Sequence, residues 1–156
     1  MKAQNGLFIT LEGIEGAGKS TAMQFLENYW QSREYPVVLT REPGGTETAE
    51  EIREIILRHH HEQVVPAAEL LLYFASRAQH VEHLIKPALA DRKIVICDRF
   101  TDSSYAYQSA GREIAEEYLR SLEQLVQGHL QPDITILFDL SPEVGCARAR
   151  QVGEPD

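Results

Sequence analysis

The sequence is poor in the features that mark secreted and membrane proteins. It has two cysteines in 156 residues, Cys97 and Cys146, which are too few for a disulfide framework. Cys97 lies in an apolar segment, so we expect an inert, buried thiol there. No apolar run approaches the roughly 18 residues that a membrane-spanning helix needs. The first six residues contain no apolar core of a secretion signal. We therefore expect a cytoplasmic protein that does not enter a membrane.

An excess of basic residues is also lacking. Lys and Arg number 15 against 24 Asp and Glu, which gives a formal net charge of −9. A general nucleic-acid-binding protein would present a basic face, so we expect no nucleic-acid partner. The acidic balance does not exclude anionic substrates, because a local cluster of Arg and Lys can focus positive potential inside an acidic shell.

Short apolar segments alternate with segments of helical periodicity along the chain. Such alternation predicts an α/β fold, in which helices cover both faces of a parallel sheet. The strand candidates are nearly continuous apolar runs, which is the pattern of strands that are buried on both faces. Strands are expected at 7–11, 37–40, 94–97 and 134–140, and helices at 19–33, 46–60, 67–91 and 113–129 and from about residue 142.

The segment 13–20 reads G-x-x-x-x-G-K-[ST], the pattern of a phosphate-binding loop. A strand pattern precedes it and a helical pattern follows, which is the context that this loop requires. The glycines let the backbone curl around an anion, and Lys19 can reach the β- and γ-phosphates of a nucleotide. The expected phosphate-binding residues are Gly13, Ile14, Glu15, Gly16, Ala17, Gly18, Lys19, Ser20 and Thr21.

Charged residues follow two of the other predicted strands. Ligands of open parallel sheets bind at the carboxyl ends of the strands, where Arg41, Asp98 and Arg99 are expected. Asp98 and the hydroxyl of Ser20 are the expected residues for Mg²⁺, although an Asp at a strand end can instead cap the next helix. The arginines can bind a second anion through their planar guanidinium groups, or form structural ion pairs.

Beyond the loop, the chain resembles the bacterial thymidylate kinases over nearly its whole length. These are P-loop nucleoside-monophosphate kinases, which phosphorylate dTMP to dTDP with ATP and Mg²⁺. The resemblance implies a three-layer P-loop kinase fold with a parallel sheet of order 2-3-1-4, and with the family's fifth strand missing from this chain. The matching segments are LEGIEGAGKST at 11–21, TREPGGT at 40–46, YFASRAQHVEHLIKPAL at 73–89, DRF at 98–100, SSYAYQ at 103–108 and PDITILFDLSPEVG at 132–145.

The resemblance also implies roles for residues that match the family's motifs. The loop would bind ATP. Tyr73 stands where the family places an aromatic residue, usually Phe, that stacks on thymine. The other implied dTMP-binding residues are Glu15 near the sugar, Arg41, Arg77 and Arg99 around the acceptor phosphate, and Ser104, Tyr107 and Gln108 near the base and sugar. Taken from the residues alone, Gln108 could equally be a residue on the surface of a helix.

The implied catalytic residues are Lys19, Arg99 and Arg150. Some family members carry a basic residue directly after the acidic residue of the loop, where this chain has Gly16. The chain therefore resembles the type in which a lid segment supplies the catalytic arginine. Arg150 lies where that lid would begin, although an arginine there also suits a solvated helix end.

The resemblance leads us to expect a single P-loop kinase domain over residues 1–156 that is incomplete at its C-terminal end. Family members continue through the lid, another helix, a fifth strand and a closing helix, whereas residues 148–156 reach only the start of the lid. The family also forms homodimers through helices. The expected helix at 67–91 has enough apolar surface to take part in such a dimer.

Three other functions fit parts of the pattern. Glu12 precedes the loop at the point where deoxynucleoside kinases carry a base for a sugar hydroxyl, so phosphorylation of a nucleoside is the main alternative. An ATPase or GTPase switch would need a residue that positions water, and the sequence offers no candidate for it. The third alternative is a fragment that binds nucleotide without catalysis.

Overall fold

A parallel sheet of four strands forms the centre of the computed structural model, which describes residues 6–59 and 61–152. The strand order is β2-β3-β1-β4, which confirms the order implied by the resemblance. β3 is buried over its apolar residues because both of its faces are covered. The strands are β1 (Leu7–Gly13), β2 (Val37–Arg41), β3 (Ile94–Asp98) and β4 (Ile134–Phe138).

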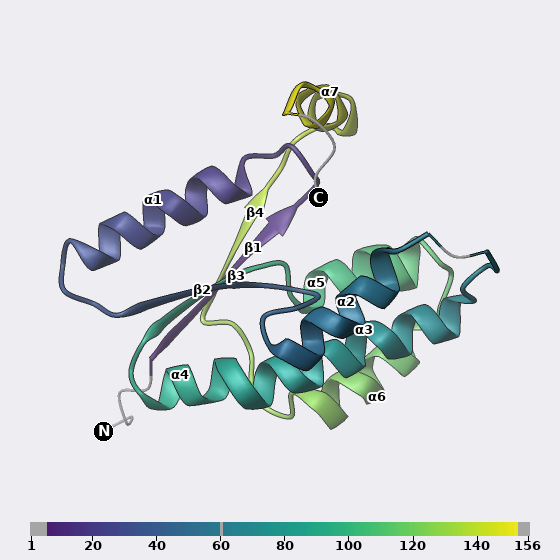
Figure 1. The fold of residues 1–156 in the computed structure, drawn as a ribbon, viewed down its shortest axis with the longest axis horizontal. Coiled ribbons are helices and arrows are strands. Elements are labelled where there is room, and N and C mark those ends of the chain that lie inside the picture. Colours follow the sequence, from purple (N-terminus) through teal and green to yellow (C-terminus); the bar gives the residue numbers. More distant parts are fainter. Residues whose placement is uncertain (1–5, 60, 153–156) are drawn as a thin grey trace.

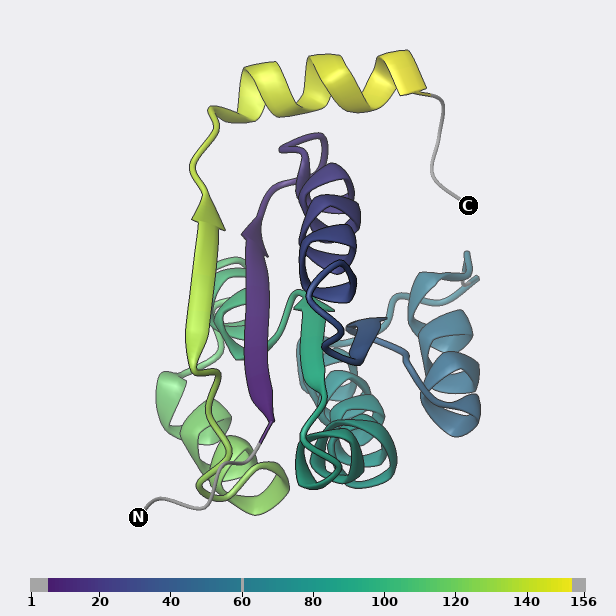
Figure 2. The same ribbon diagram turned by 90° about the vertical axis from the view of Figure 1, so that its left-hand side faces the viewer.

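Helices lie on both faces of this sheet and give the three layers that the sequence predicts (Figure 1). One helix, α1, covers one face, whereas the opposite face is covered by the long helix that starts with α3 and by α5 and α6. The helix α2 packs on α3, and α7 crosses above the carboxyl ends of the strands (Figure 2). The bounds are α1 (Lys19–Gln31), α2 (Glu47–Leu57), α3 (Pro66–His80), α4 (Lys86–Ala90), α5 (Thr101–Ser104), α6 (Glu116–Val126) and α7 (Pro142–Val152).

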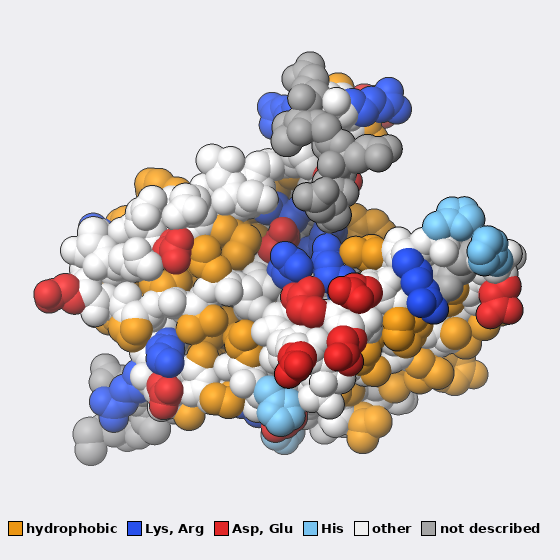
Figure 3. All heavy atoms as spheres, viewed as in Figure 1, with side chains coloured by type: hydrophobic (Ala, Val, Ile, Leu, Met, Phe, Trp, Pro, Cys, Tyr) orange, Lys and Arg blue, Asp and Glu red, His pale blue; other side chains and the backbone are white. Residues whose placement is uncertain are grey.

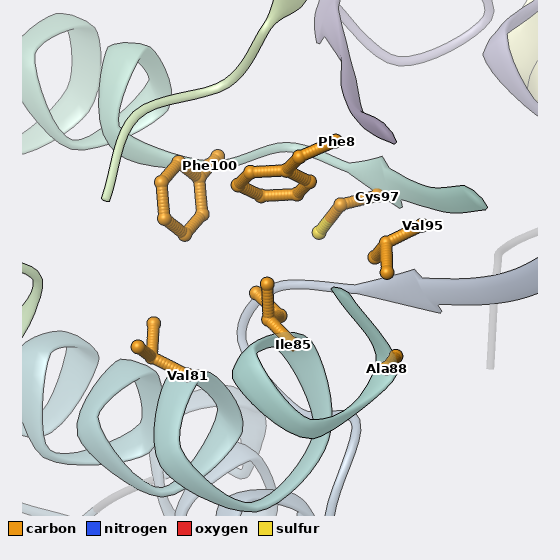
Figure 4. Close-up of a cluster of buried hydrophobic side chains, with 7 residues drawn as sticks. All are labelled: Phe8, Val81, Ile85, Ala88, Val95, Cys97 and Phe100. Carbon is orange, nitrogen blue, oxygen red and sulfur yellow. The ribbon is translucent and has the colours of Figure 1, made fainter. Parts of the chain in front are cut away.

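Apolar side chains on the two faces of the sheet form two separate cores. On the face of the long helix, the ring of Phe8 meets that of Phe100 edge to face at 5.0 Å between centroids. These rings pack on side chains of the long helix (Figure 4), among them the buried Val81 and Ile85. On the other face, Ile9, Leu11, Ile94 and Ile96 pack against α1. Cys97 belongs to the first core, as expected, and burial raises the pKa of its thiol well above the ordinary value.

The expected helix at 67–91 is one continuous rod whose middle turn is widened. Residues Val81–Ile85 form the π-helical segment η1, which joins α3 to α4. Pro87 lies one turn further on, where it cannot donate a backbone hydrogen bond and where its ring crowds the carbonyl of the preceding turn. A widened turn accommodates both effects.

The helical segment between β3 and α6 was not among the helices expected from periodicity. It consists of α5 and the π-helical segment η2 (Tyr105–Ala110). Its residues are mainly Ser, Thr and Tyr, which have modest helix propensity, so periodicity did not reveal it. The helix expected at 113–129 is shorter, because α6 covers only Glu116–Val126.

The outer strand β4 is only partly covered. Leu137 is 69% exposed and Ile134 is 47% exposed, whereas Ile136 and Phe138 pack with the core on the α1 face. Within the described residues, no helix is long and apolar enough to cross a membrane.

Replacing Phe8 by alanine should lower the free energy of unfolding by about 3–5 kcal/mol, because a fully buried aromatic ring leaves a cavity. Phe25→Ala is the matched control, since Phe25 is 66% exposed on α1 and should change stability by about 0.5 kcal/mol or less. Urea-induced unfolding measures both. Equal losses for the two variants would contradict this description of the core.

Candidate functional site

The parallel register brings the predicted functional residues to one edge of the sheet. Arg41 is paired with Asp98, and Asp98 is paired with Leu11, directly before Glu12 and Gly13. The loop after β1, the turn after β2 and the start of α5 after β3 therefore meet at the carboxyl ends. Figure 3 shows Lys and Arg side chains gathered at the centre of one face, between α1 and the pair α2–α3, with acidic side chains beside them.

The loop after β1 has the backbone geometry of a phosphate-binding loop. Gly13, Gly16 and Gly18 have φ values of 141°, 73° and 95°, which glycine adopts readily and other residues rarely do. Gly18 is the N-cap of α1, so the positive end of the helix dipole faces the loop. A side chain at Gly13 would also come within 2.8 Å of the Phe138 carbonyl oxygen on β4.

Lys19 folds back over this loop. Its Nζ donates to the carbonyl oxygens of Gly13 at 2.9 Å and Ile14 at 3.0 Å, and lies 3.8 Å from Oδ1 of Asp98. The side chain is 7% exposed, and burial lowers the pKa of its ammonium group although Asp98 opposes that shift. Two carbonyl contacts are weak substitutes for a polyanion, so the ammonium is poised to bind nucleotide phosphates.

Asp98 and Ser20 fit a divalent cation that is held mainly by phosphates and water. Oδ1 of Asp98 is buried and has no hydrogen-bond partner within residues 6–59 and 61–152. Ser20 is exposed in the first turn of α1. In the same ranges, no three His, Cys, Asp or Glu side chains form a group suited to a metal ion. Mg²⁺ typically takes few protein ligands and keeps its water, so this sparse donor set suits it.

Three arginines border the space next to Asp98. Arg41 pairs with Glu50 at 3.0 Å and is more than half exposed. Arg53, which sequence reasoning missed, donates to the Pro43 carbonyl at 2.8 Å; burial and the nearby Arg41 lower the pKa of its guanidinium group. Arg53 lies on α2 outside any motif, so the sequence carried no signal that could have found it.

Arg99, the third arginine, has an unusual backbone conformation. Its φ is 69°, in the left-handed region that non-glycine residues rarely adopt. Its Nη1 donates to Oγ of Ser103 at 3.3 Å and to the hydroxyl of Tyr107 at 3.2 Å, and its guanidinium lies 5.2 Å from the centre of the Tyr107 ring. Strained residues that are held by their surroundings are common at functional sites.

Arg77 is held in a buried network rather than at the surface. Its Nε donates to Glu42 at 2.7 Å, and its Nη2 donates to the Phe100 carbonyl at 3.1 Å and to Oγ of Ser104 at 2.9 Å. The other carboxylate oxygen of Glu42 lies 2.9 Å from Nδ1 of His80. Nη1 of Arg77 is buried and unpaired among the described residues, so it is a donor available to a ligand.

The close packing of the TREPGGT turn on this network requires the glycines of the turn. His80 Nε2 lies 2.6 Å from Oγ1 of Thr40, and a side chain at Gly45 would come within 2.6 Å of both residues. Gly45 also has a φ of 92°. The backbone N–H of Gly44 donates to Oγ of Ser76 at 3.1 Å, which ties the turn to α3. The motif therefore packs a loop closely against the long helix.

The remaining residues expected near the base lie around Tyr73. Tyr73 is half-buried on α3, and burial together with Glu69 raises the pKa of its hydroxyl. Ser104 and Gln108 are each 2% exposed, whereas Tyr107 is 46% exposed. The burial of Gln108 shows that the alternative of a surface helix residue is wrong. These positions agree with a pocket for a planar ligand beside the ring of Tyr73.

Glu15 lies in the loop after β1, and Arg150 lies on α7, which packs over that loop. Glu15 is exposed, and α7 packs closely over it, because a side chain at Gly145 would come within 2.8 Å of the Glu15 carbonyl oxygen and 2.4 Å of the Ile14 side chain. Arg150 is exposed in the last turn of α7. The rest of the expected lid, residues 153–156, lies outside the described residues.

Glu12 stabilises the turn that follows β3. It is 5% exposed and accepts hydrogen bonds from the backbone N–H of Phe100 at 2.7 Å and from Oγ of Ser103 at 2.6 Å. Burial raises the pKa of its carboxyl group, an effect that these two hydrogen bonds oppose. Both of its oxygens are therefore engaged in holding the start of α5, beside Arg99.

Replacing Glu12 by glutamine should make stability less dependent on pH. The pKa of Glu12 is raised above 4.5, so the folded state holds this proton more tightly than the unfolded state does. The stability that this proton binding contributes is therefore lost as pH rises through the raised pKa. Compared with Glu12→Gln, the unchanged protein should lose stability as pH rises above 4.5 and through the raised pKa, as measured by urea unfolding. A difference that stayed constant over this range would contradict the shift.

Comparisons with known proteins agree with this geometry. The family model for thymidylate kinase matches residues 11–156. The thymidylate kinase of Pseudomonas fluorescens (strain SBW25) is 57% identical over 151 residues, which are 97% of this chain and 72% of that protein. That of Ectopseudomonas mendocina (strain ymp) is 55% identical over the same shares. The crystal structure of thymidylate kinase from Ehrlichia chaffeensis superposes with a TM-score of 0.80 at 41% identity, covering 94% of this chain and 79% of that one. The chain belongs to the thymidylate kinase family.

Proposed function

We propose that the protein transfers the γ-phosphoryl group of ATP to dTMP, with Mg²⁺, and so produces dTDP. Membership of the thymidylate kinase family supports the reaction. The observation that carries it in this chain is a pair of adjacent anion sites on either side of Asp98. One is the loop with Lys19, and the other is the group of arginines after β2 and β3. One nucleotide alone would need only the first.

On the donor side, residues Gly13 to Thr21 would bind the phosphates of ATP. The loop supplies backbone N–H groups and the helix dipole, and Lys19 exchanges its carbonyl contacts for phosphate oxygens. Ser20 and Asp98 would hold Mg²⁺ directly or through water, and the ion would neutralise charge between the donor phosphates.

On the acceptor side, the proposed pocket extends from Arg99 to Gln108. Tyr73 would stack on thymine, while Arg41 and Arg99 would bind the monophosphate, and the missed residue Arg53 would add a third positive charge. Arg77 offers its unpaired Nη1 from the buried side. The remaining contacts would come from Glu15, Ser104, Tyr107 and Gln108.

Catalysis by this site depends on positioning the two substrates and on positive charge near the transferred group, more than on proton transfer. A monophosphate oxygen is already anionic and can attack phosphorus without a strong base. Lys19, Arg99 and Arg150 would hold donor and acceptor in line and stabilise the charge on the transferred group. Arg150 takes part in this proposal because α7 leads from the loop towards the expected lid.

A single P-loop kinase domain in the cytoplasm is part of the same proposal. The one buried cysteine, Cys97, is a free thiol in the core, which suits a reducing compartment. The proposed partners are the small molecules ATP and dTMP. The net charge of −9 argues against a nucleic-acid partner.

Phosphorylation of a nucleoside is not favoured, because Glu12 lacks a free oxygen to act as the base for a sugar hydroxyl. Both of its carboxylate oxygens already accept hydrogen bonds from the turn before α5. Glu12, the residue that suggested a nucleoside kinase, thus has a structural role.

The test is ADP release from ATP and Mg²⁺ with dTMP or thymidine as acceptor. We expect turnover with dTMP and none with thymidine. Lys19→Ala should lower turnover at least about 100-fold, because the ammonium that stabilises the negative charge on the transferred group is lost, while dTMP binding measured by calorimetry changes little. Turnover with thymidine alone would contradict the proposed acceptor, and an equal loss of dTMP binding would contradict the donor role of Lys19.

We also propose that the protein forms a homodimer through α3 and α6. These helices pack together around the buried Leu70, Phe74 and Leu119. Their outer surfaces expose Leu71 at 58% and Leu125 at 79%, which is costly for helices that face only water.

A charge at the proposed interface should separate the dimer. Leu71→Glu buries an unpaired carboxylate there and should yield monomers in light scattering at a concentration where the unchanged protein is dimeric. Phe25→Glu, at a comparably exposed apolar position on the opposite layer, should leave the dimer intact. A monomeric unchanged protein, or a dimer that survives Leu71→Glu, would exclude this interface.

A further inference from the structure

Two helices in the proposed base pocket face each other through a ladder of polar contacts. Glu69, Tyr73 and Arg77 are spaced four residues apart and share one face of α3. Ser104 and Gln108 are spaced likewise along α5 and η2. Arg77 donates to Ser104 at 2.9 Å at one end of the ladder. At the other end, Gln108 donates to Glu69 at 3.2 Å, so Tyr73 lies between two cross-links.

The contact between Gln108 and Glu69 determines how the amide of Gln108 is oriented. A carboxylate can only accept hydrogen bonds, so the atom of Gln108 that faces Glu69 must be the NH₂ group, Nε2. The amide oxygen, Oε1, then points away from Glu69. Among residues that the structure describes, none donates a hydrogen bond to Oε1. The acceptor of the Gln108 amide is therefore free for a ligand, while its NH₂ group is engaged by Glu69.

Glu69 is itself held in place by Arg112. The second oxygen of Glu69 accepts from Nη2 of Arg112 at 2.9 Å, and the carboxylate is 17% exposed. Gln108 is 2% exposed, so its amide has few other partners to choose from. A buried amide next to an oriented carboxylate has one favourable orientation, because turning it over would set oxygen against oxygen.

An acceptor at Oε1 and a donor at Nη1 of Arg77 match one kind of pyrimidine edge. Thymine and uracil carry an imide N–H at position 3, flanked by carbonyl oxygens. Cytosine carries an unprotonated ring nitrogen at position 3 and an amino group at position 4, so it would set acceptor against acceptor at Gln108. It would also set donor against donor at Arg77. Each mismatch leaves buried polar groups unpaired.

We propose that Glu69 is a positioning residue for base selection: by orienting the amide of Gln108, it makes the acceptor site select a 2,4-dioxopyrimidine nucleotide over a cytosine nucleotide. Glu69 does not touch the base itself. This inference rests on the proposed function, since it takes the pocket beside Tyr73 to be the site of the acceptor base.

The test is calorimetric binding of dTMP and dCMP to the unchanged protein and to Glu69→Gln. A glutamine at position 69 can donate as well as accept, so the amide of Gln108 is free to turn over and offer its NH₂ group to cytosine. We expect the preference for dTMP over dCMP to fall about tenfold, mainly through weaker dTMP binding. A preference that stays unchanged in this variant would overturn the role of Glu69.

Arg112→Gln separates this role from the loss of an ion pair. It removes the Arg112–Glu69 ion pair but leaves the carboxylate that orients Gln108. The preference of this variant for dTMP over dCMP should therefore stay within about threefold of that of the unchanged protein, which is less than the loss of one hydrogen bond would cause. An equal fall in both variants would show that the ion pair and not the amide orientation sets the preference. That result would overturn the proposal.

A modified nucleotide tests the amide orientation without any substitution in the protein. The monophosphate of N3-methylthymidine lacks the imide N–H, so the unchanged protein should bind it on the order of 100-fold more weakly than dTMP. Binding as tight as that of dTMP would show that Oε1 does not read position 3. If the unchanged protein bound no dTMP at all, the proposed function itself would fail, which is a different outcome from a lost preference.

Discussion

The buried carboxylate of Glu42 joins the parts of the molecule on which the acceptor site depends. It lies after β2 and holds Arg77 and His80, which are both on α3. Arg77 in turn contacts α5 through Ser104 and the turn before it through the Phe100 carbonyl. Three segments far apart in the sequence are thus tied to one another by one side chain. Removing one member of a buried charged group typically costs about 3–5 kcal/mol of stability. The positions of the three segments therefore depend on one another.

Much of the arrangement around this carboxylate follows from the sequence. The alternation of apolar and helical segments predicts a parallel sheet, and the carboxyl ends of parallel strands must share one edge. The loop at 13–20 and the residues Arg41, Asp98 and Arg99 were therefore expected to meet, and the register confirms it. The strand order 2-3-1-4 came from the resemblance to a family, and the structure confirms that too.

Other features could not be read from the sequence because they depend on contacts between distant segments. The segment 101–110 is helical although its residues favour helices little, since Glu12 holds its first turn and the ladder with α3 holds its side. Arg53 belongs to no motif, and only the fold places it near Arg41. The residues alone leave open whether Gln108 faces solvent, because its burial depends on the contact with α3. The roles of these side chains stay proposals, as does that of Arg150.

The contact of Gly145 with the loop has a consequence for how the two ends of the site move. α7 rests on Ile14 and Glu15 at a point where no side chain fits between them. The guanidinium-bearing end of the helix, at Arg150, lies five residues or about 7.5 Å further along the axis, at 1.5 Å per residue. Because no gap separates α7 from the loop at Gly145, the position of α7, and with it that of Arg150, depends on the conformation of Ile14 and Glu15. A change in the conformation of the loop on nucleotide binding would therefore displace α7 as well.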